Sequence, residues 1–439
     1  MIKGGYNGKI LRVDLTDGAI QTQPLDDAIA QKFLGGRGYG AKILYDENPP
    51  GVDPLAPENR LIFFTSPFVG GQVPCGVKPC VVTKSPLTQT ILMSLSGGDF
   101  GSQLKFTGYD GIVITGRAEH PVYLQFHNEE VQIKDASFVW GKGTLETQDK
   151  LKEAFGDKAS RVAAIGPAGE KLVRFSSIIN ERRAFGRGGV GAVMGAKNLK
   201  AIVARGTKLP KLFDEQGFNA LVKELRERFK SEEAKSVAKY GTSGVVSLVN
   251  GMGIFPTRNY QSGTFQGASK IGGEAREAFV KRHATCYRCP VGCSVLVTAT
   301  EEPYTGIETE GPEYETLWSF GGQCGNDNLS AIIAANELCA RYGLDTISTG
   351  NSIGFAMECF EKGIITKEDT DGLELKFGNH KAMIEMVRKI GNRDGFGDVL
   401  AEGVYRASQK IGKNSQRLAM QVKGAEMCGY NPRGAMGQG

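Results

Sequence analysis

The sequence lacks any apolar run of about 18 residues, the length that a membrane-spanning helix needs. Its opening stretch, MIKGGYNGK, has no apolar segment of the kind that marks a secretory signal. A strong charge of either sign is missing as well, because a net charge of +5 is spread along 439 residues. These absences argue against a membrane span, against export and against nucleic-acid binding.

Two residue types stand out in what is present. The nine cysteines are an odd number in a chain without a signal, which indicates a reducing cytoplasm and metal binding rather than disulfides. The 60 glycines allow positive φ angles and close backbone approach. In a folded enzyme, so many glycines suggest loops that press against a cofactor.

The chain divides into two parts of unlike pattern. Residues 1–207 contain short apolar runs bounded by Gly, Pro, Asp or Asn, such as RLIFFTSP, GIVITGRA and KAIVARG, which predict strands. After a linker at 206–212, residues 213–439 show helical periodicity, and most of the segments end at Gly. One long amphipathic helix is expected over residues 214–241. The prediction is an α+β protein, with a sheet domain followed by a largely helical domain.

The strongest local motif is CYRCPVGC, which spaces Cys286, Cys289 and Cys293 as Cys-x2-Cys-x3-Cys. Clustered thiolates at this spacing favour an iron–sulfur cluster. One alternative is zinc, with His283 as the fourth ligand. The other is three buried cysteines that act as small hydrophobic residues.

The glycine-rich loop RRAFGRGGVGAVMG formally contains G-x-G-x-x-G, but a charged segment precedes it and no acidic residue follows about 20 positions later. A dinucleotide site is therefore disfavoured. Exposed backbone N–H groups together with Arg183 and Arg187 still favour an anionic ligand. The alternative is a tight turn with solvated arginines.

Two acidic positions have ordinary local explanations. Glu315 follows Pro312 near a helix start, where the helix dipole favours acids. Asp345 follows Gly343, so the pair reads as a helix C-cap and the N-cap of the next helix. Cys324 lies between glycines, where a thiol could reach a cofactor or simply be buried.

These stretches resemble the aldehyde:ferredoxin oxidoreductases. The resemblance is carried in order by GGRGYGAKILY, VVTKSPLT, SGGDFGSQLKFTGYDGIVITG, AAIGPAGE, GRGGVGAVMGAKNLKAIV, CYRCPVGC, EGPEYETLW, YGLDTISTG and NPRGAMGQG. The family implies a sheet domain that forms the base for a tungsten or molybdenum bis-pyranopterin, with magnesium bridging the pterin phosphates. It also implies a 4Fe-4S cluster nearby.

The resemblance assigns roles to particular positions of this sequence. Cys286, Cys289 and Cys293 correspond to cluster ligands, and Glu315 to the carboxylate near the metal. A thiolate at Cys324 could bind or tune tungsten, so we treat Cys324 and Glu315 as candidate catalytic residues. The implied pterin and phosphate contacts are Lys78, Ser96, Gly97, Gly98, Arg183, Ala184, Gly186, Arg187, Gly188, Gly189, Gly343, Leu344 and Asp345.

The sequence also departs from the family pattern. Ala340 replaces the first Asp of the D-x-x-G-L-D motif, and Lys78 stands where arginine is common, which loses the bidentate fork. AANE at residues 334–337 replaces a Glu-x-x-His motif, so we expect no metal bridging two subunits there. The family's fourth cluster ligand lies in a Gly-Leu-Cys motif beyond residue 439, so we expect this sequence to lack a C-terminal domain.

The function that this implies is oxidation of aldehydes to carboxylates, with electrons passing to ferredoxin or a ferredoxin-like subunit of a homo- or hetero-oligomer. One alternative is the tungsten-pterin subunit of an aromatic acyl-CoA reductase. An alternative of another class is an inactive truncated paralogue that binds zinc or partner proteins.

Overall fold

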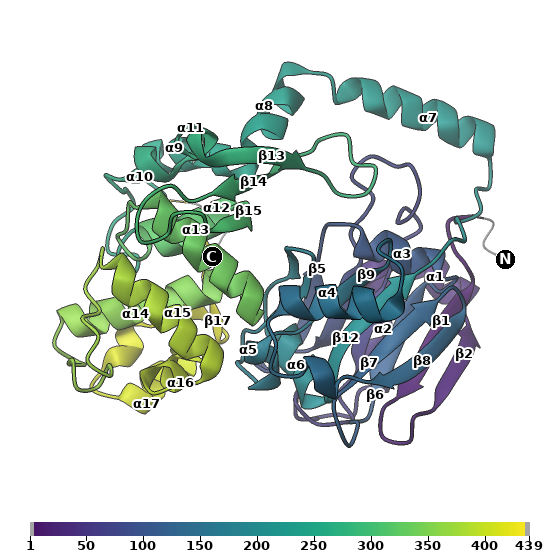
Figure 1. Cartoon of the computed structure of the whole chain (residues 1–439), viewed down its shortest axis with the longest axis horizontal. Helices are drawn as coiled ribbons and strands as arrows, with labels where there is room; N and C mark the ends of the chain where they lie inside the picture. The colour runs from purple at the N-terminus through teal and green to yellow at the C-terminus, as the bar shows by residue number, and fades with distance from the viewer. Residues whose placement is uncertain (1–3, 435–439) are drawn as a thin grey trace.

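The computed structural model describes residues 4–434 (Figure 1). Strands β1 to β12 lie in the N-terminal part, which ends with β12 at Arg205, and most of the helices follow. The expected α+β architecture, with the sheets first and the helices second, is confirmed. The last residues of the NPRGAMGQG stretch, 435–439, lie outside the described residues.

The first sheet has six strands in the order β2-β1-β6-β3-β4-β5. The pair β1 and β6 is parallel, and the other neighbours are antiparallel. Their bounds are β1 (Lys9–Asp14), β2 (Ile20–Pro24), β3 (Leu61–Phe64), β4 (Cys80–Lys84), β5 (Ile91–Leu95) and β6 (Gly111–Thr115).

The second sheet also has six strands, in the order β11-β10-β9-β12-β7-β8. Its one parallel pair is β12 and β7. The bounds are β7 (Val122–His127), β8 (Glu130–Asp135), β9 (Arg161–Ala164), β10 (Ile178–Asn180), β11 (Arg183–Phe185) and β12 (Leu199–Arg205).

The two sheets share one hydrophobic core, and helices cover their other faces. Phe63 of the first sheet meets Phe185 of the second edge to face, with 5.8 Å between the ring centroids. Helix α2 packs on the opposite face of the first sheet and α4 on that of the second. The helices are α1 (Asp27–Phe33), α2 (Gly36–Glu47), α3 (Phe100–Phe106), α4 (Thr144–Phe155), α5 (Pro167–Glu170) and α6 (Val190–Ala196).

The second part packs helices around a separate core that contains Trp318, whose indole N–H donates to the Pro256 carbonyl at 2.8 Å. The longest of these helices, α13 and α14, are buried along most of their length because Ala, Ile, Gly and Ser line them. The helices are α9 (Val246–Gly251), α10 (Ala268–Ile271), α11 (Gly273–Arg276), α12 (Tyr314–Leu317), α13 (Leu329–Tyr342), α14 (Thr346–Glu361), α15 (His380–Asn392), α16 (Phe396–Leu400) and α17 (Val404–Ile411).

Two features of this second part differ from the expectation. Residues 214–241 form two helices, α7 (Glu215–Arg228) and α8 (Glu232–Tyr240), because the Ser231 hydroxyl accepts from the Ala234 N–H and starts a new helix. A small three-stranded sheet, β13 (Val280–Ala284), β14 (Ser294–Thr298) and β15 (Glu308–Glu310), also lies within the mainly helical region. A short hairpin follows near the end, β16 (Gln421–Val422) and β17 (Ala425–Glu426).

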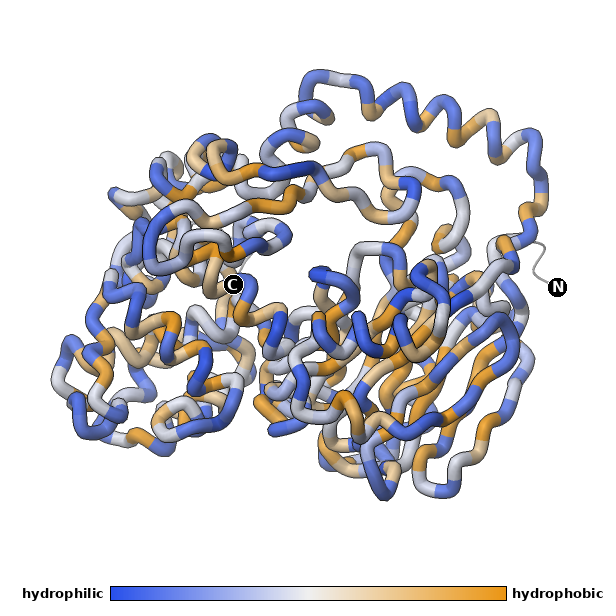
Figure 2. Tube along the Cα trace, viewed as in Figure 1, coloured by the Kyte–Doolittle hydropathy of each residue, from blue (hydrophilic) through white to orange (hydrophobic). Residues whose placement is uncertain are grey.

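Apolar residues follow the strands of the two large sheets, whereas α7 is mostly hydrophilic and lies across the outside of the molecule (Figure 2). Within residues 4–434, no helix has the length and apolar content that crossing a membrane requires.

A buried ion pair lies between α3 and β6. Lys105 and Asp110 are both fully buried and form an ion pair. Asp110 also accepts from the backbone N–H groups of Asn7, at 3.0 Å, and Gly8, at 2.8 Å. The pair therefore ties the N-terminal segment to the first sheet.

We predict that Lys105→Met lowers the free energy of unfolding by about 3–5 kcal/mol, because it leaves the Asp110 charge buried without its cation. Lys105→Met combined with Asp110→Asn should cost less than the sum of the two single changes. Chemical denaturation measures both quantities. The matched control is Lys42→Met in the exposed Lys42–Asp46 pair, which should cost less than about 1 kcal/mol. Equal effects of the two lysine changes would contradict the prediction.

Candidate metal and cofactor site

The cysteine motif forms the hairpin loop between β13 and β14. The Cys289 N–H donates to the Cys286 carbonyl at 3.0 Å, which closes a turn inside the loop. The neighbouring Tyr287 ring meets Phe106 at the end of α3 edge to face, with centroids 5.6 Å apart. The loop from the second part of the chain is therefore seated on the sheet domain.

Cys286 approaches the backbone that follows β5. The Gly98 N–H donates to the Cys286 sulfur at 3.2 Å. A Cβ atom on Gly97 would lie 3.0 Å from the same sulfur, and Gly98 has a φ angle of +86°. Position 98 therefore requires glycine, and a side chain at position 97 would press on the Cys286 sulfur. The predicted cofactor residues Gly97 and Gly98 and the predicted ligand Cys286 are brought together here.

A fourth thiol, which the sequence analysis missed, belongs to the same group. Cys75 lies on the loop between β3 and β4, and its sulfur is 3.9 Å from the Cys289 sulfur. Burial, together with the nearby Cys289 thiol, raises the pKa of Cys75 to about 11. The short stretch around Cys75 carries no motif, so nothing in the sequence pointed to this contact.

The zinc alternative needs four donors around one ion. Within the described residues, no three His, Cys, Asp or Glu side chains gather closely enough to hold a single ion. His283, the fourth donor of that alternative, is exposed on β13. An iron–sulfur cluster, in which each thiolate binds a different iron, does not need its thiols gathered around one point.

The hairpin of β10 and β11 lies between the two halves of the candidate site, which are the cysteine loop and the residues around Arg187. The Asn180 amide donates to the Ser96 hydroxyl at 2.6 Å, which fixes β10 to the turn after β5. The amide oxygen of Asn180 is buried beside Gly98 and has no hydrogen-bond partner among the described residues. A buried acceptor without a donor fits a cofactor with ring N–H groups, such as a pterin.

Arg183 lies at the tip of this hairpin and forms an ion pair with Glu310 at 2.5 Å. Burial opposes its charge, but Glu310 and the nearby Cys286 thiol raise the pKa of Arg183 above its ordinary value. Ala184 follows it on β11. Arg183 is therefore a cation held in place beside the Cys286 thiol.

Arg187 follows this hairpin and lies in the half of the candidate site that does not contain the thiols. Its Nε is 3.3 Å from a carboxylate oxygen of Asp345, and its Nη2 donates to the Glu426 carbonyl at 2.5 Å. Burial opposes the charge, while Asp345, Glu426 and Glu315 raise the pKa of Arg187. Asp345 also accepts from the Ile347 and Ser348 N–H groups, so its expected role as a helix N-cap is confirmed.

The remaining residues of the predicted cofactor-binding set lie in loops where the two parts of the chain meet. The Gly343 carbonyl accepts from the Ser177 N–H at 2.8 Å, and Gly343 has the left-handed conformation expected of a helix C-cap. Leu344 is buried and bridges to Ser176. Gly186, Gly188 and Gly189 form the turn before α6, and a Cβ on Gly189 would lie 2.1 Å from the Arg174 carbonyl oxygen.

Glu315 lies in the first turn of α12, close to Arg187. One of its oxygens accepts from the Gly429 N–H at 2.9 Å. Burial raises the pKa of Glu315 to about 7, although the Gly429 hydrogen bond and Arg187 work in the opposite direction. A carboxyl with this pKa exchanges a proton at neutral pH.

Two predicted residues lie outside these contacts. Cys324 is fully buried in the helical core, its S–H donates to the Ser319 carbonyl at 3.2 Å, and burial raises the pKa of the thiol. This geometry suits a packed core thiol, and the catalytic role of Cys324 stays a prediction without support from its surroundings. Lys78 is exposed on the loop that carries Cys75.

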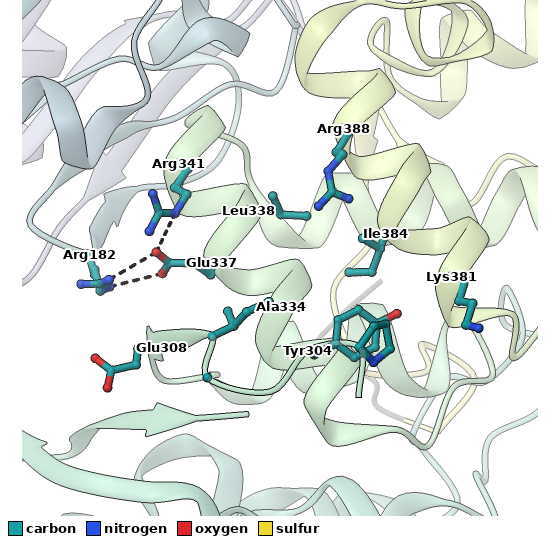
Figure 3. Close-up of a pocket in the computed structure, with 13 residues that line it drawn as sticks. Arg182, Tyr304, Glu308, Ala334, Glu337, Leu338, Arg341, Lys381, Ile384 and Arg388 are labelled. Atoms are coloured by element: carbon teal, nitrogen blue, oxygen red, sulfur yellow. Dashed lines mark hydrogen bonds and ion pairs between the residues drawn. The ribbon is translucent and has the colours of Figure 1, made fainter. Parts of the chain in front are cut away.

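The AANE helix segment lines a cleft of about 810 Å³ (Figure 3). Glu337 lies between Arg182 and Arg341, with its oxygens 3.2 Å and 2.9 Å from their nitrogens. Both arginines therefore engage the carboxylate at the last position of the AANE segment. A second cleft of about 940 Å³ is lined by residues next to the thiols, including Gly98, Arg183, Thr285 and Glu310.

Cysteine thiols that lie close to glycine-rich loops are typical of one class of proteins, the oxidoreductases that bind metal cofactors. Two family models match the chain: the N-terminal domain of aldehyde ferredoxin oxidoreductase over residues 10–206, and domains 2 and 3 of the same family over residues 220–439. The chain belongs to the aldehyde ferredoxin oxidoreductase family and is an oxidoreductase.

Individual relatives agree with this assignment. A tungsten-containing aldehyde ferredoxin oxidoreductase of Pyrococcus abyssi is 47% identical and aligns with 99% of this chain and 72% of its own length. The WOR-like subunit of an aliphatic sulfonate oxidoreductase of Pyrococcus furiosus is 37% identical over 95% of this chain and 70% of its own length. The active-site complex BamBC of benzoyl coenzyme A reductase, solved with 1,5-dienoyl-CoA, superposes with a TM-score of 0.87 at 31% identity over 98% of this chain and 67% of its own.

The shifted pKa of Glu315 predicts a pH-dependent stability. The folded protein holds this proton up to about pH 7, whereas the ordinary value is 4.5, so folding binds protons between these limits. The free energy of unfolding should therefore fall as the pH rises from 4.5 to 7, by roughly 3 kcal/mol from this group.

Glu315→Gln should remove that part of the slope. Denaturation of both proteins at a series of pH values gives the difference, in which the other titrating groups cancel. Parallel curves for the wild type and the variant across this range would show that Glu315 ionises normally.

Proposed function

We propose that the chain oxidises aldehydes to carboxylates at a tungsten-pterin centre and passes the electrons out through a 4Fe-4S cluster. The contact that carries the proposal joins the Cys286 sulfur to the backbone of Gly97 and Gly98. It brings the cysteine loop against the glycine turn to which the resemblance assigns the pterin contact. Relatives named as tungsten-containing aldehyde ferredoxin oxidoreductases, at 42–47% identity, support the same reaction.

The residues that would hold the cofactors lie in three loops. Ser96 to Gly98 and Arg183 to Gly189 would contact the pterins and their phosphates, with which a magnesium ion would bind, and Gly343 to Asp345 would complete that contact. The sulfurs of Cys286, Cys289 and Cys293 would hold the cluster. The unpartnered Asn180 oxygen beside Gly98 supports a ligand with N–H donors at this place.

The overall reaction converts one aldehyde and one water into a carboxylic acid, two protons and two electrons. The bound tungsten centre supplies the redox chemistry. Glu315 takes a proton from the reacting water or aldehyde, because its carboxyl is buried and ionises near pH 7. The ion pair of Arg187 and Asp345 lies near this carboxyl and sets its electrostatic surroundings. Ferredoxin, or a subunit that resembles it, accepts the electrons.

Reduction of an aromatic acyl-CoA thioester is the second candidate. The superposition on the benzoyl coenzyme A reductase complex, with its TM-score of 0.87, favours it. The higher identity to the aldehyde ferredoxin oxidoreductases, 47% against 31%, favours aldehyde oxidation. Assays of the anaerobically purified protein with aldehydes and with aromatic acyl-CoA esters separate the two.

Metal analysis tests the cofactors directly. Protein purified without air should contain tungsten or molybdenum and about four irons per chain. Cys286→Ala should lose the iron, because that thiolate would be one of the cluster's ligands. Zinc alone in the wild type would instead support a protein that binds zinc or partner proteins, and no metal at all would remove the catalytic proposal.

Replacement of Glu315 tests the proton transfer. We predict that Glu315→Gln keeps its tungsten but lowers kcat for aldehyde oxidation by about 100-fold or more. The matched control is Glu308→Gln, which alters a carboxylate on the outer strand β15. A Glu315→Gln enzyme with tungsten and the wild-type rate would exclude this role.

A further inference from the structure

A short segment near the end of the described chain contacts Glu315. We call residues 427–431 the anchored segment, because side chains from other elements hold its backbone. The Gly429 N–H of this segment donates to a carboxylate oxygen of Glu315 at 2.9 Å. The carbonyl groups of its first three residues each accept a hydrogen bond from a side chain, the donors being, in chain order, Asn351, Tyr260 and Tyr314.

The peptide unit between Cys428 and Gly429 links Tyr260 to Glu315. The Tyr260 hydroxyl donates to the carbonyl of this unit at 2.6 Å, and the N–H of the same unit donates to Glu315. The C=O and N–H groups of a trans peptide point in opposite directions, so the unit lies between the two side chains. A donor at the carbonyl polarises the amide and strengthens its N–H as a donor. Tyr260 therefore acts on Glu315 through this peptide.

Tyr314 holds the next carbonyl, that of Gly429. It directly precedes Glu315 on α12, so two neighbouring residues of one helix contact the N–H and the C=O of Gly429. The Tyr430 ring also packs on the Tyr314 ring, with 5.1 Å between the centroids. The anchored segment therefore cannot move along α12 without breaking at least one of these contacts.

The surroundings of the anchored segment are fitted to this position. A Cβ atom on Gly429 would lie 2.9 Å from the ring of the fully buried Trp318, so a larger residue would push the segment away. Tyr260 ends a run of three residues with left-handed backbone, since Arg258, Asn259 and Tyr260 have φ angles of +48°, +52° and +63°. Residues other than glycine seldom adopt this conformation, and it is retained where the orientation of a side chain has a use.

We propose that the Tyr260 and Tyr314 hydroxyls, acting through the Cys428–Gly429 backbone, position the Glu315 carboxylate for proton transfer. The inference rests on the proposed reaction, in which a proton leaves the reacting water or aldehyde and binds to a carboxylate oxygen of Glu315. The Gly429 N–H orients this carboxylate and stabilises its charged form. It therefore opposes burial, which alone would keep Glu315 protonated and unable to accept the proton.

Replacing either tyrosine by phenylalanine changes this hydrogen bonding without changing a charge. Burial raises the pKa of both hydroxyls far above neutral, so both are uncharged at the pH values of an assay. The other charged and titratable groups near Glu315 and its partner arginine stay in place, and these are Arg187, Asp345, Glu426, Cys428 and Tyr430.

The test compares four proteins purified as holoenzymes without air: the wild type, Tyr260→Phe, Tyr314→Phe and Tyr304→Phe. Tyr304 is buried as well, its hydroxyl lies 2.7 Å from Nδ1 of His380, and it lines the cleft of Figure 3. Its variant is the control for loss of a buried tyrosine hydrogen bond away from Glu315. The readouts are tungsten content and kcat/KM for an aldehyde as a function of pH, with an artificial electron acceptor.

Tyr260→Phe and Tyr314→Phe should keep their tungsten, but the acidic limb of the kcat/KM profile should move up by about one pH unit. The reason is that a weakened Gly429 hydrogen bond stabilises the Glu315 carboxylate less. At pH 6 this shift corresponds to a fall of about tenfold in kcat/KM. The Tyr304→Phe profile should coincide with that of the wild type. Four coincident profiles would overturn the proposal.

Failure of the proposed function looks different, because the wild type would then oxidise no aldehyde at any pH. Unfolding measurements test the positioning without turnover. The part of the stability slope that Glu315→Gln removes should extend about one pH unit higher when Tyr260→Phe is present, since a higher pKa in the folded state prolongs the loss of stability as the pH rises. The same pH range with and without Tyr260→Phe would contradict the positioning role.

Discussion

Four arginines of one segment tie the two parts of the chain together. Arg174, Arg182, Arg183 and Arg187 flank or lie on the β10–β11 hairpin of the sheet domain, and each pairs with a carboxylate of the helical part. The partners, in the same order, are Glu402 at 2.5 Å, Glu337 at 3.2 Å, Glu310 at 2.5 Å and Asp345 at 3.3 Å. Because these carboxylates are all largely buried, each pair is screened little and fixes the position of one part against the other.

The site depends on this alignment. Arg183 and Glu310 hold the hairpin tip next to Cys286, so the cysteine loop meets Gly97 and Gly98 at hydrogen-bond distance. Arg187 and Asp345 hold the other end of the same hairpin beside Glu315. A shift between the two parts would therefore move the thiols and the carboxylate together, away from the loops of the sheet domain.

Local sequence patterns predicted the features that depend on neighbouring residues. Apolar runs bounded by turns, such as Leu61–Phe64, became strands, and Gly343 with Asp345 became a C-cap and an N-cap. Strand β13 was missed because its residues, VKRHA, are mostly polar and exposed, which leaves no alternating pattern to read.

Features that depend on distant residues could not be read from the sequence. Nothing near Cys75 indicates that it meets the cysteine motif, because its neighbour Cys289 lies 214 positions away. The environment of Cys324 was equally hidden: flanking glycines suggested access to a cofactor, but the thiol is enclosed by the helical core. The pairing of each arginine with its carboxylate likewise follows only from how the two parts dock.

The charges around Arg187 explain why Glu315 can keep a proton. One guanidinium faces three carboxyl groups, those of Asp345, Glu426 and Glu315, and it cannot neutralise all of them. Asp345 forms the direct ion pair and accepts from two helix N–H groups, so it keeps the charge. Burial raises the pKa of both Glu426 and Glu315.

Of these two acids, Glu426 is completely enclosed, whereas Glu315 is only partly buried. A proton on Glu426 has no route to solvent or substrate without a local opening, so that carboxyl serves to balance the charge of its surroundings. Glu315 is therefore the acid of this group that can exchange a proton at neutral pH. The arrangement separates the site into a half that contains the thiols, beside Arg183, and a half that contains the buried carboxyl groups, beside Arg187.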